Sequence, residues 1–487
     1  MRQTCIGAIG SNVYVRLTHL RARVWTMALA LGLLCGQPKS ASAANALLQD
    51  ARFVTLEENF QPGPSNRPSP DSPIDSAMLP ATGSALYSET YWTAFADQDL
   101  VTLRQAARTD PEARFAQAMT LLAGGNHESA ESAFVAAAIE TRDLNVAVAA
   151  QVMLATTLRY ERKWTKLRDL PLNSKLGPDD RKITSDLESW GKAFADAATE
   201  VATFPDKTVM LPLKVTAVGT PVIRVRVNGR EYDFWLDTGS SMTVISSAVA
   251  ADAKIAALSS DILTVRTFAG STPVRAASVQ RLEIGPIVLT NSPAVIIDAS
   301  LMYLRASAEG VPAGGLKVDG IIGWDTIRQF DLTMDYADGW ITLRQPVQRS
   351  LSAEKQNLAW LGRPFVEVRS KDAGNFHFML DTGAQTTFLN ATVIEKTHIN
   401  TRSADNRVFG IARAGRQTTR VVPVLSIDVG GKSLRLQDVI VYGPIVSGLI
   451  NSDGILGSDV AKYGTIRIDA TNGIFTIGGL PDEDPAE

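Results

Sequence analysis

The sequence predicts an α+β multidomain protein in which an N-terminal α-helical array precedes a two-lobed, mainly β region. Three observations support this prediction. Residues 86–204 are rich in alanine and place apolar residues at helical spacing, whereas the chain from Leu211 onward alternates with a period of two. The β part also repeats itself. A chain of 487 residues is long enough for several separate cores.

Residues 1–43 have the features of a secretory signal peptide. The first 23 residues carry four arginines and no acidic residue, an apolar run follows from Val24 to Cys35, and Ala41–Ala43 has the small-residue pattern of a cleavage site. The apolar run is too short to span a membrane, which requires about 20 residues. We therefore expect an exported protein, periplasmic or secreted.

The composition excludes several functional classes. A formal charge of −3 and a pI near 6.0 argue against a strongly basic nucleic-acid binder. Both cysteines, Cys5 and Cys35, leave with the signal peptide, so the mature chain has no thiol nucleophile. Its three histidines, His127, His377 and His398, lack metal-ligand spacing. The sequence predicts no metal and no cofactor, and leaves carboxylates and hydroxyls as the catalytic groups.

Residues 44–85 are expected to form a flexible linker. Six prolines lie between residues 61 and 80 among serines, a composition that cannot pack a core. No apolar run of 18 or more residues follows, so we expect no membrane span after signal cleavage.

Residues 86–204 predict short helices punctuated by glycine, with Gly124-Gly125 as one stop. Part of this pattern resembles tetratricopeptide repeats over one and a half repeats. Such a domain could bind a protein partner or peptide, act as a removable pro-segment, or be a plain helical bundle. The three expected apolar faces are Phe115, Met119 and Leu122; Ala130, Phe134 and Ala138; and Val148, Val152, Ala155 and Leu158.

The rest of the chain predicts two β lobes, residues 205–347 and 348–487. Asn228-Gly229 joins the alternating stretches 221–227 and 232–236, and this dipeptide is a strong hairpin signal. A similar strand-turn-strand pattern occurs around residues 427–436.

The two lobes share a sequence repeat. Phe234–Ile245 aligns with Phe378–Leu389, and each segment contains Asp-Thr-Gly after an apolar strand. Further on, Asp319–Asp325 aligns with Asp453–Asp459, and each contains two apolar residues followed by glycine. Roughly 0.1 Asp-Thr-Gly triplets would be expected by chance in a chain of this length. Two triplets in matching contexts therefore form a specific signal.

This double pattern resembles the aspartic peptidases, in particular the retropepsin and pepsin group, over about residues 205–480. The resemblance implies that Asp237 and Asp381 meet between the lobes as a catalytic dyad that cleaves a protein or peptide substrate. Two adjacent carboxyls cannot both ionise cheaply, so they share a proton. The ionised member can activate water, and the protonated member can donate to the peptide carbonyl.

Five further residues are expected to support the dyad. The resemblance implies that Thr238 and Thr382 hydrogen-bond across the lobes. Gly239 and Gly383 would let the two backbones approach closely, because glycine has no Cβ. The Ser240 hydroxyl could bond the carboxylate of the first triplet.

The two triplets continue differently, and this difference predicts an asymmetric dyad. Ser240 follows the first and Ala384 the second. A hydroxyl bonded to Asp237 would favour its ionised form, so Asp237 is expected to ionise more readily than Asp381.

Other residues are interpreted as structural. Asp325 and Asp459 follow the glycine turns and are expected to be helix N-caps. Two glycine-bearing hairpins, Val265–Val274 and Val408–Thr418, are candidates for substrate-covering flaps. Three residues on or beside the strands are expected to be core or surface residues without a catalytic role: Trp235, Phe378 and His377.

The sequence therefore favours an exported aspartic endopeptidase with an N-terminal helical domain. One alternative is a non-catalytic peptide- or partner-binding protein that retains this fold. Another is a helical scaffold whose β domain is only structural.

Overall fold

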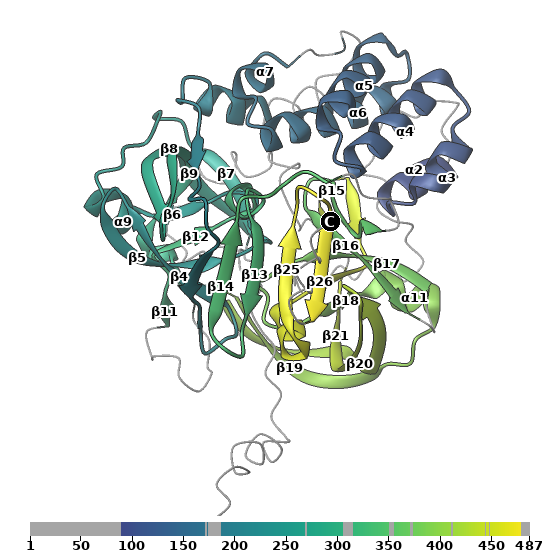
Figure 1. Cartoon of the computed structure of the whole chain (residues 1–487). Coiled ribbons are helices and arrows are strands. Elements are labelled where there is room, and N and C mark those ends of the chain that lie inside the picture. The colour runs from purple at the N-terminus through teal and green to yellow at the C-terminus, as the bar shows by residue number, and fades with distance from the viewer. Residues whose placement is uncertain are drawn as a thin grey trace, which may run out of the picture.

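The computed structural model describes residues 89–170, 173, 187–267, 270–304, 315–349, 355–370, 374–410, 413–443, 445–447 and 449–478. The predicted signal peptide and the whole of the predicted linker lie outside these residues. The described chain is helical at its N-terminal end and mostly β after it, as the sequence predicts, and the helices lie across the two β lobes (Figure 1).

The helical region is a succession of short helices in which neighbours in sequence pack together, α4 on α5 and α5 on α6. Helix α4 begins with a capping box, in which Thr109 accepts from the backbone of Glu112 and the Glu112 side chain accepts in return. It ends at Ala123, before the predicted Gly124 stop. Residues 187–194 are also helical. The named helices are α2 (Glu89–Ala96), α3 (Leu100–Ala106), α4 (Asp110–Ala123), α5 (His127–Glu140), α6 (Leu144–Tyr160) and α7 (Trp164–Arg168).

The predicted apolar faces form the core of this region. Phe115 and Phe134, on consecutive helices, pack with their ring centroids 5.9 Å apart, and every residue of the three predicted faces is buried. Burying an aromatic side chain of this size stabilises the fold by roughly 2–3 kcal/mol.

Lobe 1 is a closed β-barrel. Strand β8 pairs with both β4 and β9, which closes the strand order β9-β6-β12-β5-β4-β8 into a ring. At the predicted hairpin, Asn228 and Gly229 both have positive φ, 47° and 84°, which suits the tight turn between β4 and β5. The strands of this sheet are β1 (Val201–Thr203), β3 (Lys214–Val215), β4 (Pro221–Val227), β5 (Arg230–Leu236), β6 (Val244–Ser246), β7 (Leu263–Thr267), β8 (Gly270–Ile284), β9 (Ile287–Ile297) and β12 (Gly320–Ile322).

Lobe 2 repeats this barrel. Strand β20 pairs with β21 and β16, closing the order β16-β17-β24-β18-β21-β20. Gly430 and Gly431, with positive φ of 58° and 79°, make the turn between β20 and β21, where the sequence predicts a strand-turn-strand pattern. The strands are β15 (Leu358–Trp360), β16 (Pro364–Ser370), β17 (Gly374–Leu380), β18 (Phe388–Asn390), β19 (Arg402–Gly410), β20 (Arg413–Val429), β21 (Lys432–Tyr442) and β24 (Gly454–Leu456).

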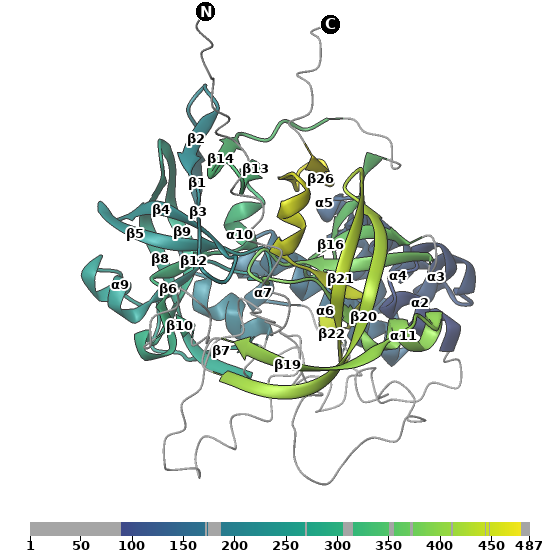
Figure 2. The same ribbon diagram turned by 90° about the horizontal axis from the view of Figure 1, so that it is seen from below.

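A third sheet joins the lobes. Its order is β2-β14-β13-β25-β26, and β13 of lobe 1 pairs antiparallel with β25 of lobe 2, with Leu332 opposite Ile468. Figure 2 shows this sheet on one side of the molecule and the hairpins β7–β8 and β19–β20 on the other. The interlobe strands are β2 (Val209–Pro212), β13 (Asp331–Asp335), β14 (Trp340–Arg344), β25 (Thr465–Asp469) and β26 (Ile474–Gly478).

Short elements complete the two lobes. Four short strands form two two-stranded sheets, β10–β11 and β22–β23, and the other elements are helices that follow barrel strands. Their bounds are β10 (Tyr303–Leu304), β11 (Leu316–Lys317), β22 (Ile445–Ser447), β23 (Ile450–Ser452), α9 (Ser247–Asp252), α10 (Trp324–Ile327), α11 (Ala391–Thr397), η2 (Ala299–Leu301) and η4 (Ser458–Tyr463).

The helical region contacts both lobes. On lobe 1, the Arg162 Nη2 atom donates to the Asp325 carbonyl at 2.6 Å. On lobe 2, the Gln98 Nε2 atom donates to the Asn451 carbonyl at 2.8 Å, and the Tyr160 and Trp360 rings stack with centroids 3.9 Å apart. The helices therefore bridge the two halves of the β part.

None of the helices in the described residues is both long and apolar enough to cross a membrane.

Candidate active site

The two Asp-Thr-Gly loops begin at the ends of equivalent strands. Asp237 follows β5 and Asp381 follows β17, and each strand runs parallel to a short apolar strand, β12 or β24. The Asp237 backbone N–H donates to the Ile322 carbonyl at 3.0 Å, and that of Asp381 donates to the Leu456 carbonyl at 3.1 Å. The apolar-apolar-glycine repeat thus holds each triplet in place.

The glycines of those repeats allow the close approach that this arrangement needs. A Cβ on Gly323 would lie 2.4 Å from the Met242 carbonyl group, and one on Gly457 would lie 2.5 Å from that of Thr386. Such distances are below van der Waals contact, so only glycine fits at either position without moving the backbone.

Four hydrogen bonds cross between the lobes through the two threonines of the triplets. The Thr238 Oγ1 atom donates to the Leu380 carbonyl and accepts from the Thr382 backbone N–H, both at 2.9 Å. In return, the Thr382 Oγ1 atom donates to the Leu236 carbonyl at 2.9 Å and accepts from the Thr238 backbone N–H at 3.1 Å. Both threonines are buried, and the reciprocal bonds fix one loop against the other.

The carboxyl groups of Asp237 and Asp381 are buried and face the opposite loop. The Oδ1 atom of Asp237 accepts the backbone N–H groups of Gly239 and Ser240, at 2.8 and 3.2 Å. The Oδ1 atom of Asp381 accepts those of Gly383 and Ala384, both at 3.0 Å. The structure therefore brings the two predicted carboxyls into equivalent settings.

Their separation across the lobes is small. The Asp381 Cγ atom lies 2.5 Å from the place that a Cβ on Gly239 would take. The Asp237 Oδ2 atom is buried and has no hydrogen-bond partner among the described residues. A buried carboxylate oxygen without a donor is costly, so this atom can readily accept a bond from a water or a substrate.

Burial sets the protonation of the pair. Loss of solvation raises the pKa of Asp381 to about 6, and hydrogen bonds from the loop N–H groups oppose this rise. Burial also raises the pKa of Asp237, and the neighbouring charge on Asp381 raises it further. The pKa of both carboxyls is therefore raised, and the pair holds one proton over a range of pH.

The hydroxyl contact on which the predicted order of ionisation rested is made with another group. The Ser240 Oγ atom donates to the Met242 carbonyl at 2.6 Å, so only the Ser240 backbone N–H contacts Asp237. The hydroxyl that was expected to stabilise ionised Asp237 is used elsewhere.

Arg363 is a residue near the dyad that the sequence reasoning missed. It immediately precedes β16 and is buried, and its Nη1 atom donates to the Gly239 carbonyl of the other lobe at 2.9 Å. Its positive charge lowers the pKa of Asp381. The equivalent residue before β4 is Thr220. An arginine in the otherwise apolar stretch 358–366 was the available signal.

Asp325 and Asp459 are not helix N-caps, contrary to the prediction. Gly323 and Gly457 occupy the N-cap positions of α10 and η4, because the glycine turns end there. The two aspartates lie in the first turns instead, where their carboxylates accept from the Thr243 and Thr387 hydroxyls, at 3.1 and 2.7 Å respectively. Each carboxylate thus joins its helix to the segment that follows the Asp-Thr-Gly triplet of the same lobe.

The remaining expectations have different outcomes. Trp235 and Phe378 are buried in the barrel cores, and His377 is half-buried on β17. The candidate flaps fall on the hairpins β7–β8 and β19–β20, although residues 268–269 and 411–412 lie outside the described residues, and their role stays a prediction. In the described ranges no cluster of three or more His, Cys, Asp or Glu side chains could hold a metal ion.

A comparison with protein families gives one match. Residues 223–326 and 366–460 each match the aspartyl protease family. Each region runs from the first strands of one lobe, through its Asp-Thr-Gly loop, to the helix after its glycine turn. The predicted pair of aspartic-peptidase-like lobes is thereby confirmed. The matched regions do not include the helical region, whose tetratricopeptide-like character stays a prediction. No curated protein is similar enough to count as a match.

Proposed function

We propose that this chain, two regions of which match the aspartyl protease family, is an endopeptidase that uses Asp237 and Asp381 as its catalytic residues. One observation carries the proposal: two buried carboxyls, one from each lobe, are held in equivalent hydrogen-bonded loops and approach each other between the lobes. Structural aspartates have no need of this shared geometry.

The geometry supports a general acid–base mechanism. Ionised Asp381 takes a proton from a water held between the carboxyls, and the resulting hydroxide attacks the peptide carbonyl carbon. Protonated Asp237 donates its proton to the carbonyl oxygen, which gives a neutral tetrahedral diol. The C–N bond then breaks as Asp381 returns its proton to the leaving nitrogen and Asp237 recovers one from the diol. The products are a carboxylic acid and an amine, and the dyad returns to its starting state.

The pKa shifts support these roles of base and acid. Asp381, with a pKa raised to about 6, is the base, and Asp237, whose pKa is raised further, is the acid. A general base is most effective when its pKa lies close to the working pH. We therefore expect the acidic limb of the pH profile of kcat/KM to have an apparent pKa near 6.

The test is cleavage of an unstructured protein substrate by the purified mature chain between pH 3 and 7, with and without a statine-type inhibitor. Asp237→Asn and Asp381→Asn are each expected to lower kcat at least about a thousandfold, because each removes a proton-transfer group. Asp459→Asn is the matched control. Asp459 is a buried aspartate of the same repeat, outside the dyad, and asparagine can still accept from Thr387.

Cleavage that survives either dyad substitution would refute the assignment. No cleavage by the wild-type chain would favour a non-catalytic peptide-binding protein on the same fold.

We also propose that the protein is exported to the periplasm or secreted, on the basis of the basic, apolar and small-residue segments of residues 1–43. Mass measurement of the chain recovered from the periplasmic fraction tests this. A mature chain that begins at Ala44 supports export and retention of the helical region. A chain that begins near residue 205 would instead identify the helices as a removable pro-segment.

A further inference from the structure

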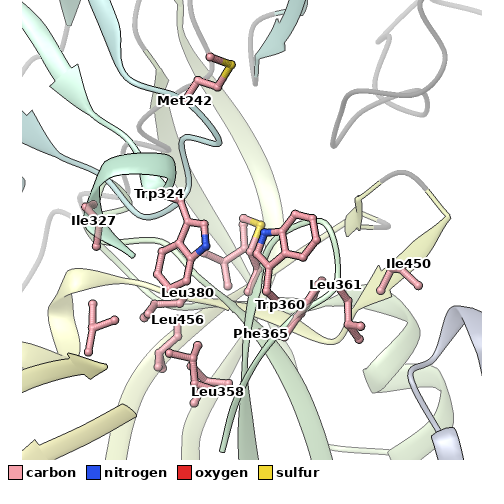
Figure 3. Close-up of a cluster of buried hydrophobic side chains, with 14 of the residues drawn as sticks. Met242, Trp324, Ile327, Leu358, Trp360, Leu361, Phe365, Leu380, Ile450 and Leu456 are labelled. Carbon is pink, nitrogen blue, oxygen red and sulfur yellow. The ribbon is translucent and has the colours of Figure 1, made fainter. Parts of the chain in front are cut away.

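A small pocket lies where the helical region and both lobes meet. We call it the junction pocket; Arg159 and Arg162 of the helical region, Ser241 and Trp324 of lobe 1, and Arg363 of lobe 2 line it. Its volume is about 20 Å³, enough for a small polar group and too little for a bulky side chain. Figure 3 shows Met242, Trp324 and Trp360, which also line this pocket, among the buried side chains between the lobes.

The pocket has an excess of positive charge. Arg162 is compensated, because it pairs with Glu200 and lies 3.7 Å from a carboxylate oxygen of Asp325. Neither Arg159 nor Arg363 forms an ion pair within the described residues. Burial and, to a smaller extent, the charge of Arg363 lower the pKa of Arg159 to about 10. Both guanidinium groups stay charged at neutral pH, so an anion beside them would be stabilised.

Two hydrogen-bond donors of the pocket are unused. The Trp324 Nε1 and Arg162 Nε atoms are buried and have no hydrogen-bond partner in the part of the chain that the structure describes. Trp324 is only 2% exposed. Most buried N–H groups in proteins are bonded, and an unbonded one costs about 1–3 kcal/mol. Two such donors, beside two buried cations that form no ion pair among the described residues, are complementary to an acceptor that carries negative charge.

The pocket is adjacent to the proposed catalytic loop of lobe 1. Ser241 and Met242 directly follow Asp237–Ser240, and Arg363 reaches from the pocket to the Gly239 carbonyl. The catalytic loop of lobe 2 has no equivalent charge beside it, because lobe 1 has Thr220 at the position where lobe 2 has Arg363. A group bound here would lie on one side of the dyad only.

Resting on the proposed function, we propose that the junction pocket binds a carboxylate of the substrate peptide. The carboxylate comes either from an aspartate or glutamate side chain or from the free C-terminus of the peptide. Both sources offer the same two acceptor oxygens and the same charge, so one pocket chemistry serves both. The helical region then takes part in substrate selection through Arg159.

Matched peptides test this inference. A peptide that the chain cleaves is made in an aspartate and an asparagine form at each position around the scissile bond, and with a free or an amidated C-terminus. The wild-type chain is expected to show a kcat/KM about tenfold to a hundredfold higher for one carboxylate form, as charge-assisted hydrogen bonds provide. A preference among the aspartate pairs assigns a side chain, and a preference in the terminal pair assigns the C-terminus.

Three variants locate the preference. Arg159→Gln is expected to bring the ratio of carboxylate to amide close to one, and Arg159→Lys to keep part of it because the charge remains. Arg168→Gln is the control, since this arginine is exposed, lies on the same helical region and pairs with Asp169. It is expected to leave the ratio unchanged. No carboxylate preference in the wild-type chain, or one that persists in Arg159→Gln, would overturn the inference.

A binding measurement separates this inference from the proposed function. The dissociation constants of the same fluorescently labelled peptides are measured by anisotropy on the Asp381→Asn chain, which needs no turnover. A carboxylate preference that depends on Arg159, together with no cleavage by the wild-type chain, would support the pocket and refute the peptidase. Cleavage by the wild-type chain, together with equal binding of the carboxylate and amide peptides, would support the peptidase and refute the pocket.

Discussion

The threonine bonds between the two loops give the sharpest prediction about what holds the dyad together. Thr238→Val keeps the shape of the side chain and removes its hydroxyl. This leaves the Leu380 carbonyl without a donor and the Thr382 backbone N–H without an acceptor, both in a buried setting. Each unmade buried bond costs about 1–3 kcal/mol, so we expect the free energy of unfolding to fall by about 2–6 kcal/mol. Thr382→Val should cost a similar amount, because it breaks the mirror-image pair of bonds.

The assay is urea unfolding followed by tryptophan fluorescence, with cleavage measured on the same samples under native conditions. Thr290→Val is the matched control, since this threonine is on a strand and makes a single exposed bond to the Val201 carbonyl. It should change stability by less than about 0.5 kcal/mol. If Thr238→Val behaved like this control and kept full activity, the idea that these bonds fix the dyad would be refuted.

Three further predictions follow from the same site. Gly239→Ala would place a methyl group 2.5 Å from the Asp381 Cγ atom, so we expect kcat to fall by about a hundredfold. A wild-type kcat in this variant would contradict the close approach of the Asp381 carboxyl to Gly239. Burial raises the folded-state pKa of Asp381 to about 6 from 3.8. The folded state therefore favours the protonated carboxyl, and the free energy of unfolding falls as the pH rises from about 4 to above 6. Asp381→Asn should therefore increase the free energy of unfolding by about 2–3 kcal/mol more at pH 7 than at pH 4, and a pH-independent difference from wild type would disagree with this. Arg363→Gln removes the positive charge that faces Asp381, so the acidic limb of the kcat/KM profile should move upward by about one pH unit. Arg363→Lys keeps a charge and should move the limb less. An unmoved limb in both variants would show that Arg363 acts only as a structural contact.

Features that depend on neighbouring residues were predictable. The Asn228-Gly229 turn, the helix end before Gly124 and the alternation of the barrel strands each follow from backbone preferences within a few residues. The repeat of the Asp-Thr-Gly triplet added long-range information, because two similar segments are expected to fold alike. The resemblance of both segments to the aspartic peptidases then implied that Asp237 and Asp381 belong to one site.

The errors lie where several local contacts compete. Ser240 can direct its hydroxyl to the carboxylate of Asp237 or to the Met242 carbonyl, and both lie within three residues. The choice depends on a rotamer that the surrounding packing selects. Asp325 has the residue type and position of an N-cap, but the glycine turn shifts the helix start by two residues, and the Thr243 hydroxyl reaches it from elsewhere in the fold.

The sequence by itself determined the two β lobes and the chemistry left to their carboxylates, because these follow from short-range preferences, an internal repeat and the family that the repeat resembles. Only the tertiary structure decided the partner of the Ser240 hydroxyl, the closure of the two barrels and which cations surround the pair. Arg363 meets the Gly239 carbonyl across 124 positions of chain, and Arg159 approaches from a separate helical region. Contacts between segments so far apart carry no periodicity in the sequence, and the burial that shifts the pKa of Asp381 exists only after the lobes and the helices have packed together.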